Sequence, residues 1–369
     1  MHPLSRRALL AAGLAAPWPV WPQPAPASRV LTPRALGFPR DHGTHNQTRT
    51  EWWYLTGHAQ DAAGRRFGFQ VTFFRSRVDA AQALKSRLAA KQLLFAHAAI
   101  TDVQGGRLHH DQRIARWNGE PPTQRERGVF ASEQDTQVVL RDWSLQRQAD
   151  GSYLAQVRGD TIRIDLSARP TQPLLLQGEQ GFSRKGPQPE QASFYVSHPQ
   201  LSVQGRLAIQ GTAFEIVQGS AWLDHEWSEA LLHPDAVGWD WIGMNLDSGH
   251  SLTAFQLRRQ DGSPLWAGGS FRAAGSADTY RFSPGELDFV PQRFWTSPLT
   301  RARYPVEWRI RTPADFYTVK AVMDPQELDS RQSTGTVYWE GLSDLFDSNG
   351  QRVGRGYLEM TGYAQRLVL

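Results

Sequence analysis

The sequence of 369 residues contains no cysteine. This absence excludes disulfide bonds, thiolate metal sites, a cysteine nucleophile and a bacterial lipoprotein anchor. Long hydrophobic runs are also missing, since no stretch reaches 18 consecutive apolar residues. We therefore expect no membrane-spanning helix.

Lysine is scarce, and neither sign of charge dominates. The chain has 40 basic and 36 acidic residues, and only four of the basic residues are lysines. Arg6 and Arg7 are the only charged residues among the first 27, so the remainder carries 40 − 2 = 38 basic against 36 acidic residues. The arginines are scattered singly among carboxylates, whereas nucleic-acid binding needs a concentrated basic face. We expect no nucleic-acid partner.

Residues 1–27 have the pattern of an export signal. Arg6 and Arg7 precede a short apolar run, and Ala25-Pro-Ala27 provides small residues for cleavage. The paired arginines favour a twin-arginine signal, and hence a periplasmic or secreted protein. A Sec-type signal or an N-terminal anchor is the alternative, and peripheral contact with a membrane is left open.

Short alternating stretches rich in Val, Phe, Trp, Tyr and Thr recur along the rest of the chain, separated by turn residues. Residues 67–74, 161–166, 201–209 and 252–257 are examples, and they predict an all-β protein built from antiparallel strands. Residues 79–94 are rich in Ala, Leu and Lys, and we predict a helix or an ordered lid there.

A weak internal repeat predicts two similar domains. Residues 52–57 lead to Phe73-Phe-Arg75, and residues 239–243 lead to Phe255-Gln-Leu-Arg258. Two consecutive antiparallel β-barrels are favoured over chance similarity between hairpins, with domains at residues 28–216 and 217–369. A closed barrel has no free edges and has room for one apolar ligand.

The densest group of reactive residues lies near the middle of the chain, in residues 219–227 and 238–241. On a strand, Asp224 and Glu226 point to one face, and His225 and Trp227 point to the other. A buried acid needs hydrogen-bond or ion-pair partners, or it has a functional role that explains its burial. The alternative is that the tryptophans fill the core and the acids cap turns or pair with arginine.

Several known motifs are incomplete. His225-Glu-Trp-Ser-Glu229 lacks the second histidine of a zinc protease, and Gly181-Phe-Ser-Arg-Lys185 lacks the last glycine of a hydrolase elbow. Asp41-His-Gly-Thr-His45 and His109-His-Asp111 have metal-like compositions, but we expect both to be solvated loops. No glycine-rich phosphate loop occurs. We therefore predict neither a metal nor another cofactor.

Several longer motifs together resemble a known family. They are Glu51-Trp-Trp-Tyr54, Phe95-Ala-His-Ala98, Trp222-Leu-Asp-His-Glu-Trp227, Gly238-Trp-Asp-Trp241, Tyr338-Trp-Glu-Gly341 and residues 356–363. In this order they resemble the AttH and carotenoid 1,2-hydratase (hydroxyneurosporene synthase) family. The resemblance implies two consecutive lipocalin-like barrels and, for the hydratase branch, addition of water to an isoprenoid double bond without a cofactor.

Protonation of an isolated alkene requires a neutral acid, an electron-rich face beside the cation and one water molecule. We predict Asp240 as the proton donor, His225 as the residue that positions or deprotonates the water, and Asp224 as the residue that orients His225. Strand alternation places Asp240 opposite its neighbours Trp239 and Trp241, so Trp222 or Trp227 is the alternative aromatic face. The ligand-binding candidates are Trp222, Glu226, Trp227, Trp239, Trp241, Glu51, Trp53, Tyr54, His97, Tyr338 and Glu340.

Three functions remain open at this point. The first is a cofactor-free hydratase for an apolar isoprenoid or lipid. The second is an exported lipid carrier that does no chemistry, in which the same aromatics line a barrel. The third is a secreted lipid-ester hydrolase, which is disfavoured by the missing nucleophile motif. The oligomeric state is not predicted.

Overall fold

The computed structural model describes residues 30–122, 128–230 and 232–367, and these form two large antiparallel sheets. The predicted signal sequence lies outside the described residues. Within them the structure contains no α-helix, only the short 3-10 turns η1 (Arg40–His42) and η2 (Asp79–Ala81). None of the described segments forms an apolar helix of membrane-spanning length. The all-β prediction is confirmed.

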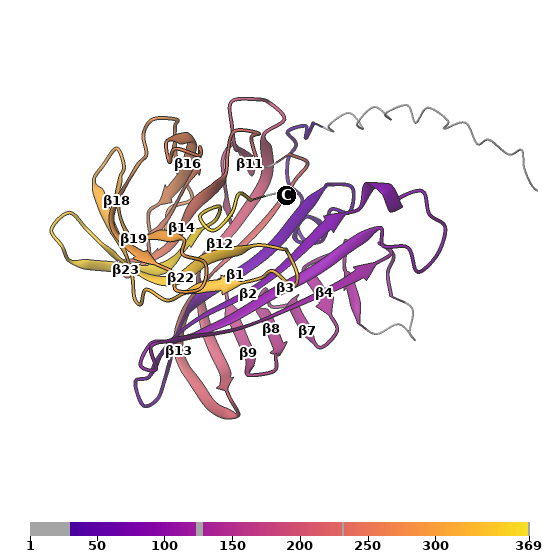
Figure 1. Cartoon of the computed structure of the whole chain (residues 1–369), viewed down its shortest axis with the longest axis horizontal. Helices are drawn as coiled ribbons and strands as arrows, with labels where there is room; N and C mark the ends of the chain where they lie inside the picture. The colour runs from indigo at the N-terminus through magenta and orange to yellow at the C-terminus, as the bar shows by residue number, and fades with distance from the viewer. Residues whose placement is uncertain (1–29, 123–127, 231, 368–369) are drawn as a thin grey trace, which may run out of the picture.

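The N-terminal sheet is a nearly closed barrel (Figure 1). Its strand order is β4-β3-β2-β1-β13-β12-β9-β8-β7-β6-β5, and β4 lies beside β5 where the barrel closes. Its strands are β1 (Thr50–Asp61), β2 (Arg66–Arg77), β3 (Gln92–Asp102), β4 (Arg107–Trp117), β5 (Val129–Ala131), β6 (Gln137–Leu140), β7 (Trp143–Arg147), β8 (Tyr153–Arg158), β9 (Ile162–Arg169), β10 (Leu175–Leu176), β11 (Phe182–Arg184), β12 (Ala192–Ile209) and β13 (Thr212–Ser228).

The C-terminal sheet is a half-barrel with the order β17-β16-β15-β14-β23-β22-β20-β19-β18. The prediction of two consecutive barrels is confirmed, with this sheet the more open of the two. Its strands are β14 (Gly238–Leu246), β15 (Ser251–Arg258), β16 (Pro264–Arg272), β17 (Tyr280–Phe282), β18 (Asp288–Thr296), β19 (Arg303–Arg311), β20 (Phe316–Ala321), β21 (Glu327–Asp329), β22 (Val337–Phe346) and β23 (Arg352–Met360).

The chain changes from one sheet to the other between Ser228 and Gly238. The boundary drawn from the sequence at residue 217 falls within β13, which pairs with β1 and β12 along its length. The hairpin β12–β13 turns at Gln210-Gly211, where both residues have positive φ. This backbone matches the twist of the flanking strands, and it allows two unusually long strands to pair.

The predicted helix at residues 79–94 is wrong. The segment forms one 3-10 turn and then a loop before β3 begins at Gln92. Leu84 and Leu88 are 52% and 70% exposed, so the segment has no apolar stripe to bury. A short helix gains little stability in water without such burial, whatever its residue propensities.

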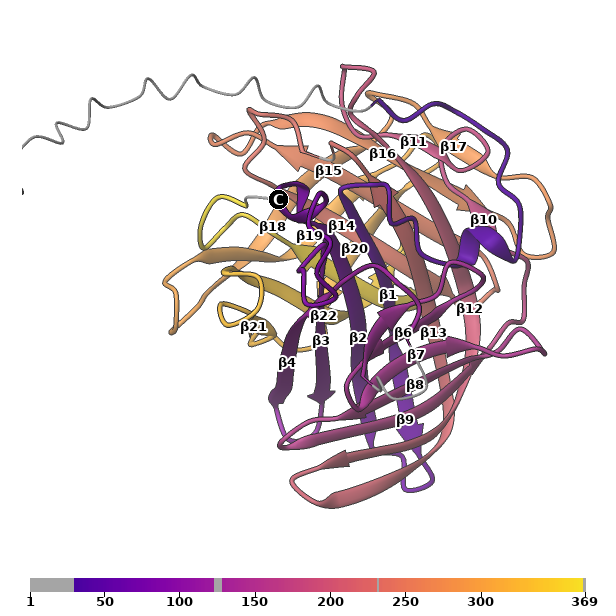
Figure 2. The same cartoon turned by 90° about the vertical axis from the view of Figure 1, so that its right-hand side faces the viewer.

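Each sheet has its own hydrophobic core, and the two sheets also pack on each other. Trp53, Leu55 and Phe73 fill the barrel, and Trp339, Leu358 and Ile242 lie in the core of the half-barrel. The opposite faces of β1, β2 and β13 contact β23, β22 and β14. Figure 2 shows β1, β12 and β13 lying against the C-terminal strands. A third apolar cluster, which includes Tyr54, Trp222, Trp241 and Tyr357, fills the contact.

Gly68 on β2 marks how closely the sheets approach. A Cβ atom there would lie 2.8 Å from the Tyr357 hydroxyl and 3.0 Å from the Leu342 Cβ. We predict that Gly68→Ala lowers the free energy of unfolding by about 1–3 kcal/mol through overpacking. Gly37→Ala is the control, because a Cβ at Gly37 meets no atom within 4 Å. Equal denaturant midpoints for the two variants would contradict this packing.

Candidate active site between the two sheets

The contact between the sheets contains an unusual number of buried acids. On β1, Trp53 and Leu55 point into the barrel, so Tyr54 points outward to the C-terminal sheet. On β22, Trp339 points into the half-barrel, and Tyr338 and Glu340 therefore face the N-terminal sheet. The same alternation brings Asp224 and Glu226 from β13 and Glu359 from β23 into the contact, together with Trp222, Trp239, Trp241, Tyr195 and His97.

Glu340 is the least satisfied of these acids. Its side chain is 3% exposed, and neither carboxyl oxygen has a well-aligned hydrogen bond from any described residue. The Tyr54 and Tyr338 hydroxyls and the Gln70 amide are nevertheless close enough to favour its charged form. Glu359 lies directly opposite Glu340 on the neighbouring strand. Buried polar atoms without partners are rare in folded proteins, so this position points to a ligand or water.

The environment of Glu340 and Glu359 favours their neutral forms. Burial raises the pKa of Glu340 well above its usual value, and the negative charge of Glu359 adds to this rise. Burial also raises the pKa of Glu359 to about 7. Two carboxyl groups this close cannot both ionise easily, so the pair retains a proton at neutral pH.

Asp224 is buried as well, but its carboxylate already accepts three hydrogen bonds within the protein. The Tyr195 hydroxyl, the Ser197 hydroxyl and the Trp222 indole each donate a hydrogen bond of 2.6 Å to its carboxylate. Burial raises the pKa of Asp224 to about 7, although these donors favour the charged form. Asp224 therefore fixes the orientation of Tyr195 and Trp222 and has little freedom to bind a ligand.

Glu226 is neutralised by a buried lysine. Lys185 Nζ lies 2.9 Å from Glu226 Oε1 and 4.4 and 4.3 Å from the ring centres of Tyr195 and Phe255. Lys185 follows β11, in the loop between β11 and β12 of the barrel sheet. A hydrogen bond from Ser270 on β16 to Gln177 joins the preceding part of this segment to the half-barrel. The cation–π contacts and the ion pair hold the segment over one end of the contact.

Aromatic rings surround the acids. The Trp241 indole donates a 3.0 Å hydrogen bond to the Tyr195 hydroxyl and meets Tyr54 edge to face at 5.4 Å. Trp222 meets the other side of Trp241 at 6.4 Å. Gly243 makes room for the Trp241 ring, because a Cβ atom there would overlap it. Trp239 hydrogen-bonds Glu359 and favours its charged form.

His97 and Tyr338 join the two sheets beside Glu340. The Tyr338 hydroxyl lies 2.8 Å from His97 Nδ1, and Gln70 donates a 3.2 Å hydrogen bond to the same hydroxyl. Burial lowers the pKa of His97 to about 3, so the ring is neutral. One ring nitrogen therefore donates and the other accepts.

A second polar group lies inside the barrel, on the other face of the same strands. Glu51 Oε2 lies 2.8 Å from Arg75 Nε. Glu51 Oε1 lies 3.0 Å from His225 Nε2 and 2.8 Å from His45 Nδ1. Burial acts to raise the pKa of Glu51, but Arg75 and the two histidines lower it well below its usual value. Trp53 stacks on His225 at 4.8 Å, and Trp227 stacks on His45 at 3.7 Å.

The prediction that residues 41–45 form a solvated loop is wrong. Asp41, His42 and His45 are all buried, and His45 Nε2 lies 3.0 Å from Asp41. His45, Glu51 and His225 each offer one ligand atom within 4.8 Å of the others, which is close enough to hold a metal ion. However, Arg75 already neutralises Glu51, and His225 Nδ1 has no hydrogen-bond partner among the described residues.

The structure does not bring the predicted catalytic residues Asp240, His225 and Asp224 together. Asp240 points into the half-barrel, away from Trp239 and Trp241, and lies 2.8 Å from Arg258 Nε. Gln256 and Tyr363 also donate hydrogen bonds to it. His225 points into the barrel and contacts Glu51, whereas Asp224 points out of it, because neighbouring residues of a strand face opposite sides.

The structure thus divides the ligand-binding candidates. Glu51, Trp53 and Trp227 lie on the inner face of the barrel sheet with the ion-pair network. The remaining candidates, Trp222, Glu226, Trp239, Trp241, Tyr54, His97, Tyr338 and Glu340, meet between the sheets. The sequence analysis missed Glu359 and Lys185. Tyr357-x-Glu359 repeats the alternation of Tyr338-x-Glu340, and this repeat was the available signal.

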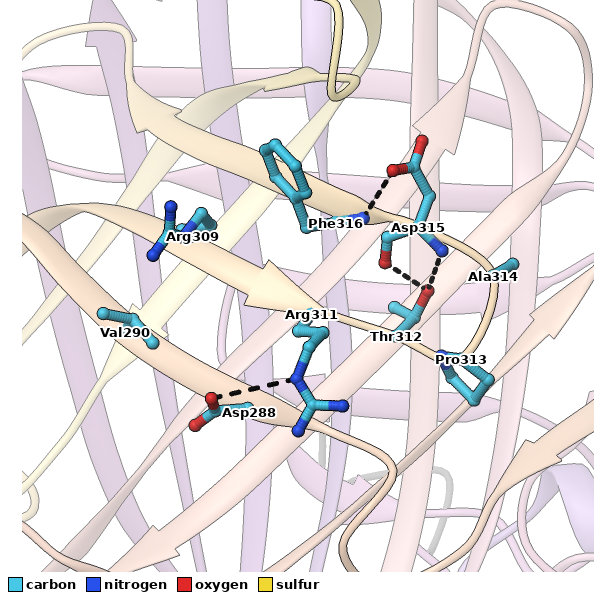
Figure 3. A pocket seen from close by; sticks show the side chains of 9 residues that line it. All are labelled: Asp288, Val290, Arg309, Arg311, Thr312, Pro313, Ala314, Asp315 and Phe316. Carbon is cyan, nitrogen blue, oxygen red and sulfur yellow. Dashed lines mark hydrogen bonds and ion pairs between the residues drawn. The ribbon is translucent and has the colours of Figure 1, made fainter.

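Open clefts lie elsewhere on the molecule. Figure 3 shows a cleft of about 330 Å³ at the end of β19 and β20, where Arg311 and Asp288 lie 4.0 Å apart beside the turn at Thr312. A second cleft of about 330 Å³ is lined by His45, Trp227 and Arg34 at the end of the barrel. Neither cleft is lined by the acids between the sheets.

Comparison with known proteins agrees with this architecture. Two sequential antiparallel barrels with acids buried between them define a two-domain, lipocalin-like protein. The sequence profile described as AttH-like matches residues 29–363. The chain belongs to the AttH-like family, as its motifs indicated. A search of curated proteins gave no match.

Solved structures share the fold. A protein from Nitrosomonas europaea, provisionally described as an AttH, is 44% identical, with a TM-score of 0.82 over 90% of this chain and 99% of its own. Kievitone hydratase from Nectria haematococca is 13% identical, with a TM-score of 0.64 over 90% of this chain and 96% of its own. CghA in complex with Sch210972 is 11% identical, with a TM-score of 0.53 over 85% and 88%.

The ion pair inside the barrel gives a stability prediction. Arg75→Met leaves Glu51 as a buried charge without its main partner, so we expect a loss of about 3–5 kcal/mol in the free energy of unfolding. Arg206→Met, which breaks the exposed pair with Glu215, is the matched control and should cost about 0–1 kcal/mol. Similar losses in urea denaturation for both variants would contradict the network.

Asp224 gives a pH prediction. Its folded pKa of about 7 lies above its ordinary value of 3.8, so the folded wild type binds an extra proton between about pH 4 and 7. Stability from this group falls as the pH rises through that window. Relative to wild type, Asp224→Asn should gain up to about 4 kcal/mol between pH 4 and 7. Parallel pH–stability curves for the two proteins would show that Asp224 is not protonated at neutral pH.

Proposed function

We propose that this protein is a cofactor-free hydratase that adds water to an isolated C=C bond of an apolar isoprenoid or other lipid, at the contact between its two sheets. The observation that carries the proposal is Glu340, a carboxyl group buried among aromatic rings with no well-aligned hydrogen bond to either oxygen and with a pKa that burial raises well above its usual value. Its environment keeps it neutral without a neighbouring guanidinium. Such a group is an acid strong enough to protonate an alkene only when the substrate excludes water.

In the proposed reaction Glu340 replaces Asp240 as the proton donor. The carboxyl O–H proton moves to one alkene carbon, and the π electrons form the new C–H bond. The other carbon becomes a carbocation, and the oxygen of one water molecule forms a bond to it. The extra proton of that water moves to the carboxylate of Glu359, and the product is an alcohol. Glu359 suits this step because its pKa of about 7 leaves it partly ionised at neutral pH.

Aromatic rings around the acids stabilise the proposed carbocation. Tyr54, Trp222 and Trp241 lie around the acids, and an aromatic face stabilises a desolvated cation by roughly 2 kcal/mol. The structural likeness to kievitone hydratase supports the fold of such an enzyme. This likeness does not identify the substrate of this chain.

The test is incubation of the purified protein in ¹⁸O-labelled water with a panel of acyclic isoprenoids and unsaturated fatty acids. We expect ¹⁸O in an alcohol product of one class, detected by mass spectrometry. A bound lipid recovered by organic extraction, with no mass change in any member of the panel, would instead favour a carrier that does no chemistry.

Substitutions separate the two candidate donors. Glu340→Gln keeps the shape but removes the acidic proton, so we expect hydration to fall on the order of 10²–10⁴-fold with ligand retention unchanged. Asp240→Asn is the control, because Asp240 lies on the inner face with Arg258. It should lower stability and leave the rate constant of the folded fraction nearly intact. The reverse pattern would return the donor role to Asp240.

We further propose export to the periplasm or beyond, with peripheral contact with membranes as a consequence of a lipid substrate. Arg6-Arg7 and the following apolar run support this location. The intact mass of protein isolated from the periplasm should correspond to a chain that begins near residue 28. A mass that includes Met1 would contradict cleavage of the signal.

A further inference from the structure

The loop between β2 and β3 is fixed at its base and exposed at its tip, residues 82–88. Ala81 is buried at the base, and the Gln82 amide donates hydrogen bonds to the backbone oxygens of Val78 at 3.0 Å and Lys91 at 2.7 Å. Every residue of the tip is exposed. Figure 1 shows this loop projecting at the right-hand side of the barrel, between β2 and β3. The closed base therefore presents the tip to the surroundings.

The tip carries two leucines that remain largely exposed. Leu84 is 52% exposed and Leu88 is 70% exposed. The backbone N–H of Leu84 donates a 3.1 Å hydrogen bond to the Ala81 oxygen, and that of Leu88 donates a 3.1 Å hydrogen bond to Ser86 Oγ. Single apolar side chains are ordinary on protein surfaces, but two on one short protruding loop form a patch.

The charged residues of the same loop are almost all basic. Lys85 and Arg87 are exposed and lie in the chain beside the two leucines. Asp79 is the one acid of the loop, and its carboxylate lies 2.6 Å from Arg77 Nε at the end of β2. Residues 80–91 contain no acid. The tip therefore combines apolar and positively charged side chains.

We propose that the tip is the membrane-binding surface of this protein and that its partner is a bilayer containing anionic phospholipids. Leu84 and Leu88 enter the boundary between headgroups and acyl chains, and Lys85 and Arg87 contact the phosphate groups. Apolar burial and attraction to anionic lipids act together at such surfaces. A stable protein interface buries about 800 Å² on each partner, which is far more than this tip offers.

The position of the loop suits a protein that takes a lipid from a bilayer. The Arg77 guanidinium donates hydrogen bonds to the Gln47 backbone oxygen and, at 3.0 Å, to Glu229. Gln47 and Glu229 line the cleft at the end of the barrel. The tip therefore lies at this end, and its insertion turns the cleft toward the bilayer. The inference deepens the proposed function, because it rests on a substrate that resides in a membrane.

Vesicle sedimentation tests this surface without a substrate. The purified protein is mixed with vesicles of equal parts phosphatidylcholine and phosphatidylglycerol, and its partition coefficient is measured. We expect Leu84→Ser/Leu88→Ser to lower the partition coefficient on the order of tenfold or more, because two apolar side chains no longer leave water. Lys85→Gln/Arg87→Gln, or vesicles of phosphatidylcholine alone, should weaken binding by a similar factor through loss of the charge attraction.

Leu154→Ser/Leu299→Ser is the matched control. These are the other two largely exposed leucines among the described residues, at 38% and 57%, and they lie on β8 and in the turn between β18 and β19. The control should keep the wild-type partition coefficient. All three double variants should unfold at the wild-type denaturant concentration, because exposed side chains add little to packing.

A fluorescent label separates insertion from adsorption by charge alone. The chain has no cysteine, so Ser86→Cys provides a single thiol at the tip. An environment-sensitive dye on this thiol should shift its emission to shorter wavelength when vesicles containing phosphatidylglycerol are added. The same dye on Asn349→Cys, in the turn between β22 and β23, should show no shift.

The outcomes are distinct. Weaker binding of both tip variants, with the control at the wild-type value and an emission shift confined to position 86, supports the inference. Wild-type binding that Leu84→Ser/Leu88→Ser leaves unchanged assigns the contact to another surface and overturns it. A wild-type protein that sediments with neither kind of vesicle also overturns it, and the leucines then fit a protein partner. The ¹⁸O assay with detergent-dispersed substrate tests the proposed hydration separately, so the two failures are distinguishable.

Discussion

The structure depends on how each buried carboxylate is neutralised. On the inner faces of the two sheets, an arginine neutralises the acid: Arg75 pairs with Glu51 in the barrel, and Arg258 pairs with Asp240 in the half-barrel. Between the sheets the solution differs. Glu340 and Glu359 have no guanidinium partner, and a proton takes the place of the cation. Loss of either arginine would leave a buried charge without its partner, whereas the protonated pair is the acid of the proposed hydration.

Strand alternation is what keeps these two solutions apart. Residues 224 and 225 are neighbours in the chain, yet Asp224 faces the contact between the sheets and His225 faces the barrel core. One strand, β13, thereby contributes to two separate polar groups. Arg75 and Arg258 lie near the end of the second strand of their hairpins, and each pairs with a buried acid. This shared role explains the internal repeat seen in the sequence.

Much of the architecture could be predicted from the sequence, because period-two patterns and turn residues are local signals. Three of the four example strands lie within observed strands, and the fourth, residues 161–166, begins one residue before β9. The opposite faces of Asp240 and Trp241 followed from alternation alone. The choice of the acid could not be predicted in this way. Asp240 and Glu340 both lie among aromatic residues in the sequence, and only tertiary structure shows that Arg258 meets one and not the other. Residues 41–45 were misjudged for the same reason, since Trp227, which stacks on His45, and Ser132, which accepts a hydrogen bond from the Thr44 backbone, come from distant parts of the chain.

The hydrogen-bonded side chains of Tyr338, His97, Ser333 and Gln112 alternate between the two halves of the chain at every step. Neither half of the chain holds more than isolated members of this series, and neither half alone would keep Glu340 dry. The chemistry proposed for this protein therefore needs both sheets, because the proposed acid and the aromatic rings around it lie in the contact between them.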